Sequence, residues 1–228
     1  MNNLQKLGGW AAWIHALAYI VSMVLGGILM FPLLGRGPGA YVAFVAGNPA
    51  VVYVWNLVAY WGAAVTLVVM VLALYERLRS SAPGAAPLAA AFGLIWAALI
   101  IGSGNLMLRD VGLLAELYAA DPAQAAAVWV TLEAVENGIV TGNEVVGSLW
   151  VLLVSLAAWR AGPWSPWLNW AGLIISLAGL LTIIPPLGEP LSMLFGVGMI
   201  IWSVGIGVAL LRAPSPITRR AVVLGGNA

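Results

Sequence analysis

Acidic and amide side chains recur at helical spacing inside one apolar part of this sequence, between residues 133 and 144. Glu133, Asn137 and Glu144 are four and seven residues apart, so on a helix they share one face, and Glu136 and Asn143 form an adjoining stripe. A polar side chain surrounded by hydrocarbon is costly, so this stripe must face protein or water. Residues of these types can bind a polar ligand group or hold a proton.

Polar side chains in the neighbouring apolar stretches are predicted to lie at a similar depth. We therefore predict an outward-facing polar pocket, a site for a ligand or a proton, that contains Asn56, Asn105, Arg109, Glu136, Asn143, Glu144 and Glu189. The alternative is structural: Glu136 or Glu144 pairs with Arg109, and the asparagines form hydrogen bonds between helices. The sequence leaves both interpretations open.

Cofactor chemistry is limited by the absence of cysteine and the presence of a single histidine, His15. Without cysteine there are no disulfides, thiolate metal sites or iron–sulfur clusters, and one histidine cannot supply a bis-histidine haem. We predict no cofactor and no metal. Three roles stay open for His15: a hydrogen bond between helices, a proton carrier, or a single axial ligand to a haem or pigment.

Hydrocarbon must surround most of the chain, because only 7% of its 228 residues are charged and its mean hydropathy is +1.02. A soluble domain carries about 25% charged residues. In lipid the backbone must satisfy its own hydrogen bonds, so we predict an all-α bundle. Six apolar stretches of spanning length form this single polytopic domain: 8–34, 50–74, 87–108, 139–159, 167–184 and 191–211.

Helical structure is also expected outside the membrane, in an outer segment from 109 to 138. Residues 111–118 can form a short amphipathic helix at the interface. Asp121 and Pro122 then resemble an N-cap and a first helical residue, so the fourth helix is predicted to run from Pro122 to Trp159. Glu189 is expected to open the sixth helix, where the helix dipole favours an acid.

Lysine and arginine favour a topology with both termini in the cytoplasm. With that orientation only Arg36 and Arg109 lie outside. The remaining cations lie inside: Lys6, Arg77, Arg79, Arg160, Arg212, Arg219 and Arg220.

Glycine-rich helix faces and the lipid bilayer are the predicted contact surfaces. Such faces allow close helix packing, either within the bundle or against a partner membrane protein. The faces concerned contain Gly138, Gly142, Gly196, Gly198, Gly205 and Gly207. The chain has no basic run, so we predict no nucleic-acid partner.

Three segments resemble a family of uncharacterised bacterial six-helix membrane proteins known as a domain of unknown function. They are Leu7-Gly8-Gly9-Trp10-Ala11-Ala12, Glu144-x-x-Gly147-x-Leu149-Trp150-x-Leu152-Leu153 leading into Arg160, and Trp167-Leu168-x-Trp170-x-Gly172-Leu173. The resemblance covers nearly the whole chain. It implies a multi-pass protein of the bacterial inner (plasma) membrane, and it brings no catalytic residues.

The absence of known catalytic motifs limits the classes of function that we consider. P-loop, zinc-protease and nucleophile-elbow motifs are absent from the sequence, which favours a protein that is not an enzyme. Our main hypothesis is an accessory subunit or a binder of a hydrophobic, lipid-like ligand. The alternative is a small transporter or proton-coupled carrier that uses Glu144, and an intramembrane enzyme built on the acidic stripe ranks last.

Overall fold

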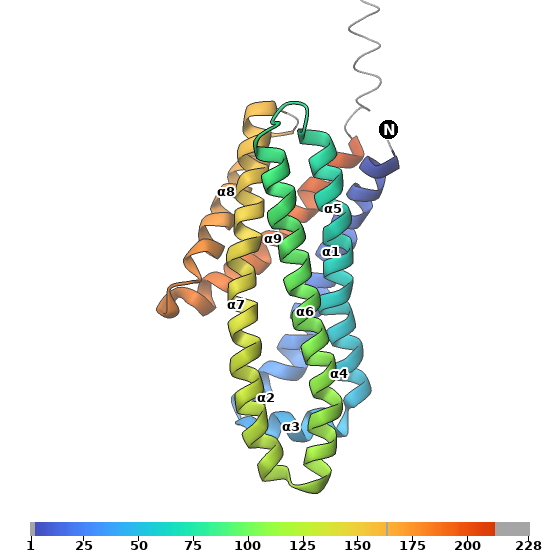
Figure 1. The fold of residues 1–228 in the computed structure, drawn as a ribbon, viewed down its shortest axis with the longest axis vertical. Coiled ribbons are helices and arrows are strands. Elements are labelled where there is room, and N and C mark those ends of the chain that lie inside the picture. Colours follow the sequence, from blue (N-terminus) through green and yellow to red (C-terminus); the bar gives the residue numbers. More distant parts are fainter. Residues whose placement is uncertain (1–2, 163, 213–228) are drawn as a thin grey trace, which may run out of the picture.

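The computed structural model describes residues 3–162 and 164–212; the side chains of residues 31, 34, 140–142 and 161 are not described. The described chain is a helical bundle without strands (Figure 1). Five helices are long and apolar enough to cross a membrane: Asn3–Met30, Pro49–Leu78, Ala85–Ala120, Pro122–Arg160 and Pro185–Arg212. Arg219 and Arg220, which entered the topology argument, lie outside the described residues.

Two of the apolar helices contain a π-helical segment. The first runs through α1 (Asn3–Leu25), η1 (Gly26–Met30) and α2 (Phe31–Leu34). The second runs through α4 (Pro49–Asn56), η2 (Leu57–Gly62) and α5 (Ala63–Leu78). π-Helical turns are rare in proteins and frequently lie at functional sites. Hydrophobicity alone did not reveal either of them.

The helices α6 (Ala85–Ala120) and α7 (Pro122–Ala161) are the longest in the bundle. At 36 and 40 residues they are roughly 54 and 60 Å long, well beyond the roughly 30 Å of a bilayer core. Residues 111–118 continue α6 instead of forming a separate interfacial helix, because no proline interrupts the chain there. The Asp121 side chain accepts hydrogen bonds from the backbone of Ala123 and Gln124, so the predicted cap is confirmed.

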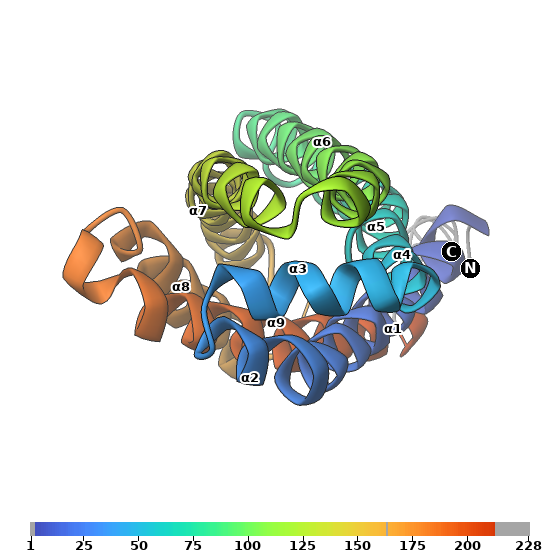
Figure 2. The same cartoon turned by 90° about the horizontal axis from the view of Figure 1, so that it is seen from below.

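A short helix that we did not predict, α3 (Pro38–Gly47), lies across the ends of α6 and α7 (Figure 2). The glycine- and proline-rich residues before it suggested a loop. Gly37 does adopt a left-handed φ of 89°, which a side chain would disfavour, but Pro38 then starts a new helix. Val42 and Val45 of α3 are buried in an outer hydrophobic cluster with Val111 and Leu114 of α6.

The last two helices form a hairpin. The helix α8 (Pro166–Leu181) has only 16 residues, and α9 (Pro185–Arg212) has 28. Our placement of Glu189 at the start of the sixth helix is wrong, because Pro185 and Pro186 belong to α9. Proline fits the first turn of a helix, where its missing N–H has no helical partner. Glu189 therefore lies beyond the first turn.

Three buried tryptophans form the centre of the bundle. The ring centroid of Trp150 lies 5.6 Å from that of Trp96 and 5.4 Å from that of Trp202, and all three residues are at most 1% exposed. Each indole packs where a neighbouring helix has a glycine. An added Cβ at Gly93 would lie within 3 Å of Trp150, one at Gly147 within 3 Å of Trp96, and one at Gly172 within 3 Å of Trp202.

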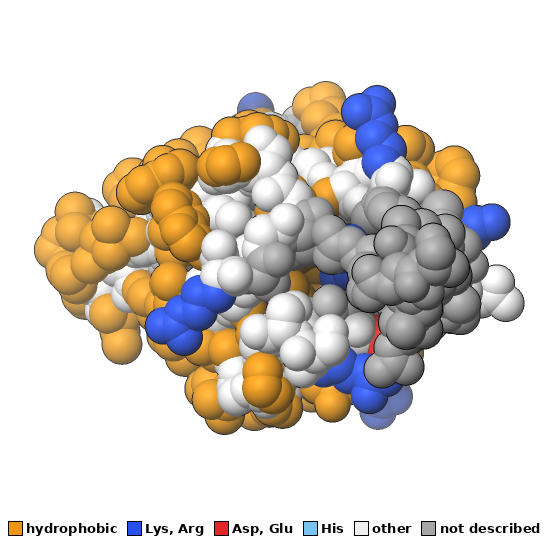
Figure 3. All heavy atoms as spheres, turned by 90° about the horizontal axis from the view of Figure 1, so that it is seen from above, with side chains coloured by type: hydrophobic (Ala, Val, Ile, Leu, Met, Phe, Trp, Pro, Cys, Tyr) orange, Lys and Arg blue, Asp and Glu red, His pale blue; other side chains and the backbone are white. Residues whose placement is uncertain are grey.

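The start of α1 and the end of α9 lie at the same end of the bundle (Figure 1). The Gln5 side chain donates a hydrogen bond of 2.8 Å to the carbonyl oxygen of Leu210. Lysine and arginine side chains gather around this end, as Figure 3 shows. The described cations of this group are Lys6, Arg77, Arg79, Arg160 and Arg212.

We expect Gly147→Ala to destabilise the protein by about 1–3 kcal/mol, since the added methyl group would meet the Trp96 ring at 2.5 Å. The matched control is Gly138→Ala on the same helix, where a Cβ has no atom within 4 Å. That change should alter stability by no more than about 1 kcal/mol. Thermal unfolding in detergent measures both, and equal midpoints for the two variants would refute the role given to Gly147.

Candidate functional site

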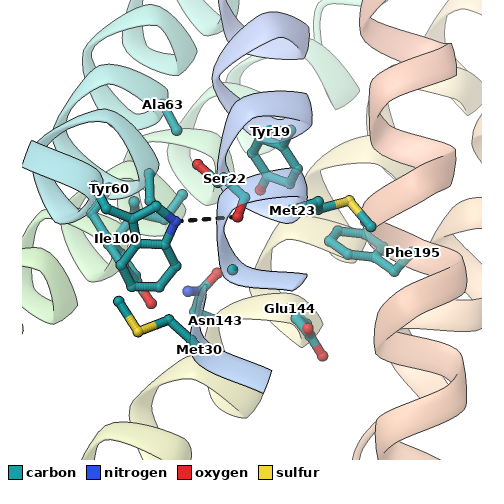
Figure 4. Close-up of a pocket in the computed structure, with 14 residues that line it drawn as sticks. Tyr19, Ser22, Met23, Met30, Tyr60, Ala63, Ile100, Asn143, Glu144 and Phe195 are labelled. Carbon is teal, nitrogen blue, oxygen red and sulfur yellow. Dashed lines mark hydrogen bonds between the residues drawn. The ribbon is translucent and has the colours of Figure 1, made fainter. Parts of the chain in front are cut away.

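A cavity of about 260 Å³ lies inside the bundle, between η1, η2, α6, α7 and α9 (Figure 4). Most of its wall is apolar or aromatic, and the lining includes Tyr19, Met23, Met30, Trp55, Tyr60 and Phe195. Apolar cavities with a few placed polar groups are typical of small-molecule sites. We call this space the inner cavity.

One side of the inner cavity carries the polar residues of α7. Glu144 is half-buried, and its carboxylate accepts a short hydrogen bond from the Ser192 hydroxyl of α9. The Thr182 side chain, just after α8, lies near the same carboxylate and donates its own hydrogen bond of 2.7 Å to the carbonyl oxygen of Gly179. Asn143 is 8% exposed, and its side-chain oxygen accepts a hydrogen bond from the indole N–H of Trp96. Three helical segments therefore fix the acid at the cavity wall.

Both π-helical segments border this cavity. Gly26 and Met30 from η1 line it, as do Ala59 and Tyr60 from η2. Next to these segments, α4 and α1 are joined by a hydrogen bond of 3.2 Å from the indole N–H of Trp55 to the carbonyl oxygen of Ser22 (Figure 4). The two π-helical segments are thus part of the cavity wall.

A second cavity of about 180 Å³ adjoins the first, and Met30 and Trp55 line both. We call it the outer cavity, because Tyr41 and Val45 of α3 line it, and α3 lies towards the end of the bundle opposite the start of α1 and the end of α9. Its acids are Asp110 of α6 and Glu133 and Glu136 of α7. Asp110 and Glu136 are both 5% exposed, and their carboxyl groups lie within interaction range of each other.

Aromatic rings complete the outer cavity. Tyr41 of α3 stacks on Trp129 of α7, with ring centroids 4.1 Å apart and ring planes 21° apart. Burial raises the pKa of Tyr41 above its usual range, and the negative charges of Glu136, Glu133 and Asp110 add to the effect. Tyr41 therefore stays a neutral phenol beside the acids.

The acidic stripe predicted on α7 faces these two cavities. Glu133, Glu136 and Asn137 line the outer cavity, and Asn143 and Glu144 line the inner one. Asn56 is 2% exposed and also lines the outer cavity. The predicted pocket is thus two adjacent spaces.

Three of the predicted pocket residues do not join either cavity. Asn105, Arg109 and Glu189 are exposed. The side-chain oxygen of Asn105 accepts a hydrogen bond of 3.2 Å from the indole N–H of Trp61. Among the described residues, no ion pair links Arg109 to Glu136 or Glu144. The pairing that our structural alternative required is therefore not found.

His15 is fully buried between α1 and α5. Its Nδ1 donates a 2.9 Å hydrogen bond to the carbonyl oxygen of Ala63, so Nε2 is left as an acceptor, and Nε2 has no partner among the described residues. The imidazole lies 4.9 Å from the ring of Tyr19, a wall residue of the inner cavity. His15 itself lines neither cavity.

Glycines of the predicted small-residue faces differ in what they contact. An added Cβ would meet Ile175 at Gly198, Leu168 at Gly205 and Trp13 at Gly207, so these three pack inside the bundle. Gly138 and Gly196 have open space around them. Gly142 lies among the residues whose side-chain surroundings are not described.

Several cavity residues were not predicted from the sequence. Asp110 had no local signal that marked it, and because it follows Arg109 directly it lies on a different face of the helix from that residue. Tyr19 and Trp55 looked like ordinary residues of apolar helices. Ser192 and Thr182 were passed over because hydroxyl groups are common in membrane helices and carry little signal alone.

Comparison with known proteins identifies one family. A family model described as "Domain of unknown function (DUF4386)" matches residues 10–213 of this chain. The expected resemblance to such a family is therefore confirmed. No curated protein and no solved structure gives a match.

Replacing Asn143 by leucine should lower the free energy of unfolding by about 1–3 kcal/mol, because the buried indole N–H of Trp96 loses its acceptor. Asn105→Leu is the control: it removes the same kind of indole acceptor at an exposed position. Denaturation in detergent, followed by circular dichroism, gives both values. Equal losses of stability in the two variants would contradict the importance of the buried hydrogen bond between Trp96 and Asn143.

Proposed function

We propose that this chain, which belongs to the DUF4386 family, is a six-span membrane protein that binds an amphipathic, lipid-like ligand in its inner cavity. The observation that carries the proposal is the cavity itself: its wall is mainly apolar and aromatic, with the Glu144 carboxylate at one point. An alkyl chain would bury its surface against Met23, Met30 and Phe195, and a polar head that donates a hydrogen bond would meet Glu144.

Depth in the bilayer supports a ligand drawn from the membrane. Glu144 lies 17 residues from the α7 end at Ala161, or roughly 26 Å. With the cationic end of α7 in the cytoplasm, this is the outer part of a core roughly 30 Å thick. A lipid-like molecule that enters from the outer leaflet would have its head close to this level.

A topology of six spans, with both termini in the cytoplasm, accounts best for the positions of the first and last helices, because α1 begins and α9 ends on the same side of the bundle. Gln5 and Leu210 lie at the same end of the bundle, so the chain crosses an even number of times between them. The five long helices are an odd number, and α8 supplies the sixth crossing. At 16 residues α8 is roughly 24 Å long, which a thinned bilayer or flanking indoles can accommodate. The cations at this end support its cytoplasmic side.

A binding role fits Glu144 better than the carrier role that we considered. Its carboxylate is held by side chains just after α8 and in α9. A carrier commonly has its coupling site near the midplane, between discontinuous helices. Here the described long helices are continuous, apart from the π-helical turns, and the acid is off-centre.

Accessibility of single cysteines tests the six-span topology, because the natural chain has none. Ser80→Cys and Ser165→Cys should react with a membrane-impermeant maleimide only when the cytoplasmic side is open. Ala120→Cys and Glu189→Cys should react from the outside; all four positions are exposed. Labelling of Ser165→Cys and Glu189→Cys from the same side would show that α8 does not cross.

Photolabelling tests the ligand class. We expect a diazirine-bearing 1-dodecanol, added to the protein in nanodiscs, to label buried wall residues such as Met30 and Phe195. Gly196→Leu should reduce this labelling roughly tenfold, because it fills the cavity at a position where a Cβ meets no atom within 4 Å. Gly138→Leu, open but away from the cavity, should leave it unchanged. Labelling that is confined to lipid-facing residues, or is insensitive to Gly196→Leu, would refute the proposal.

A further inference from the structure

The outer cavity has a chemistry that the inner cavity lacks. Three carboxyl groups line it, from Asp110, Glu133 and Glu136. In the part of the chain that the structure describes, no lysine, arginine or histidine lines it. The two cations closest in sequence to its walls, Arg36 and Arg109, are exposed and do not line it. The cavity therefore carries negative charge without a counter-ion.

Two buried oxygen atoms in this cavity have no hydrogen-bond partner in the described structure. They are Oδ2 of Asp110 and Oδ1 of Asn56, on residues that are 5% and 2% exposed. A buried polar atom without a partner is costly, so a molecule that fills the site and satisfies both atoms gains affinity from doing so. Both atoms are acceptors. The missing partner is therefore a donor.

Charge and aromatic lining narrow this donor to an ammonium group. Tyr41, Trp55 and Trp129 line the same cavity, and the faces of such rings attract cations. A metal ion fits less well, because no group of three His, Cys, Asp or Glu side chains in the described chain is arranged to hold one. A quaternary ammonium would satisfy the charge and the rings, but it has no N–H for the two free oxygens.

We propose that the outer cavity binds a small primary amine in its protonated form, between the Asp110–Glu136 pair, Asn56 and the aromatic wall. The site lies where a water-soluble molecule can reach it. Asp110 is 25 residues along α6 from Ala85 and Glu136 is 25 residues along α7 from Ala161, so both lie roughly 38 Å from the cytoplasmic end, beyond a bilayer core of roughly 30 Å. This site is separate from the lipid-like ligand of the inner cavity.

Calorimetric titration of the full chain in nanodiscs tests this site with three probes of similar size: n-butylammonium, n-butanol and n-butyltrimethylammonium. We expect saturable binding of n-butylammonium that is at least roughly tenfold tighter than binding of the other two, because only it combines charge with N–H donors. Equal affinity for butanol would show an apolar cavity without charge recognition and overturn the proposal. Preference for the trimethyl probe, or for Mg²⁺ or Ca²⁺ at the same concentration, would also overturn it.

Variants of the outer-cavity residues test whether these residues bind the amine. The double variant Asp110→Asn with Glu136→Gln, which keeps the shape of both side chains and removes the negative charge of the pair, should weaken n-butylammonium binding roughly tenfold. The control Glu116→Gln removes the same charge from an exposed position on α6 and should change nothing. Asn56→Leu should also abolish tight binding with little change in the melting midpoint; a purely structural Asn56 would instead lower the midpoint and spare binding.

The proposal of an amine site and the proposal of a lipid-like ligand can be refuted independently of each other. Gly196→Leu fills only the inner cavity and should leave the affinity for n-butylammonium unchanged. Loss of photolabelling by the dodecanol probe with intact amine binding would remove the proposed function alone. Intact photolabelling without saturable amine binding would remove the present inference alone.

Discussion

Close packing of indole rings against glycines holds the centre of this bundle together, and the position of the cavities depends on it. In α6 and α7 the contact is reciprocal: Trp96 fills the space left by Gly147, and Trp150 fills the space left by Gly93. In lipid, helices gain nothing from excluding water, so tight van der Waals contact has to supply their association. The Trp96 indole also donates to Asn143, which precedes Glu144 on α7. A packing contact therefore sets the position of the polar wall.

Hydrocarbon imposes the second constraint, on where polar groups can lie. The five acidic and amide residues of α7 between 133 and 144 all line a cavity, which satisfies the requirement that such groups avoid lipid. Because α6 and α7 are roughly twice as long as a bilayer core is thick, their outer halves need other cover. The helix α3 and the outer hydrophobic cluster provide it. Asp110 and Glu136 are thereby enclosed by protein, whereas Glu116 and Asp121, nearer the turn between α6 and α7, are exposed.

Periodicity and turn chemistry were sufficient to predict the helical class, the apolar stretches and the start of α7, because each rests on local signals. Asp121 caps its own helix, and 18 or more apolar residues indicate a span wherever they occur. Contacts between distant helices have no local signal. The Asp110–Glu136 pair, the Ser192–Glu144 hydrogen bond and the Trp55–Ser22 hydrogen bond join residues from different helices. Helix α3 was missed because it is short and its first residues, Pro38 and Gly39, favour turns.

The two cavities differ in polarity but share a wall, and this links what they can bind. Met30 ends one π-helical segment, Trp55 precedes the other by two residues, and both side chains line both cavities. A flexible thioether adapts its shape readily, and the hydrogen bond from Trp55 to Ser22 is the main polar restraint on this wall. An occupant that displaces either side chain changes the volume on the other side. An occupant that displaced Met30 or Trp55 would therefore alter affinity in the other cavity, and by thermodynamic linkage the effect would be reciprocal. A change that leaves both side chains in place, such as Gly196→Leu, would not alter it. Two occupants of unlike chemistry, one from the membrane and one from water, would in this way change each other's affinity through the side chains of Met30 and Trp55.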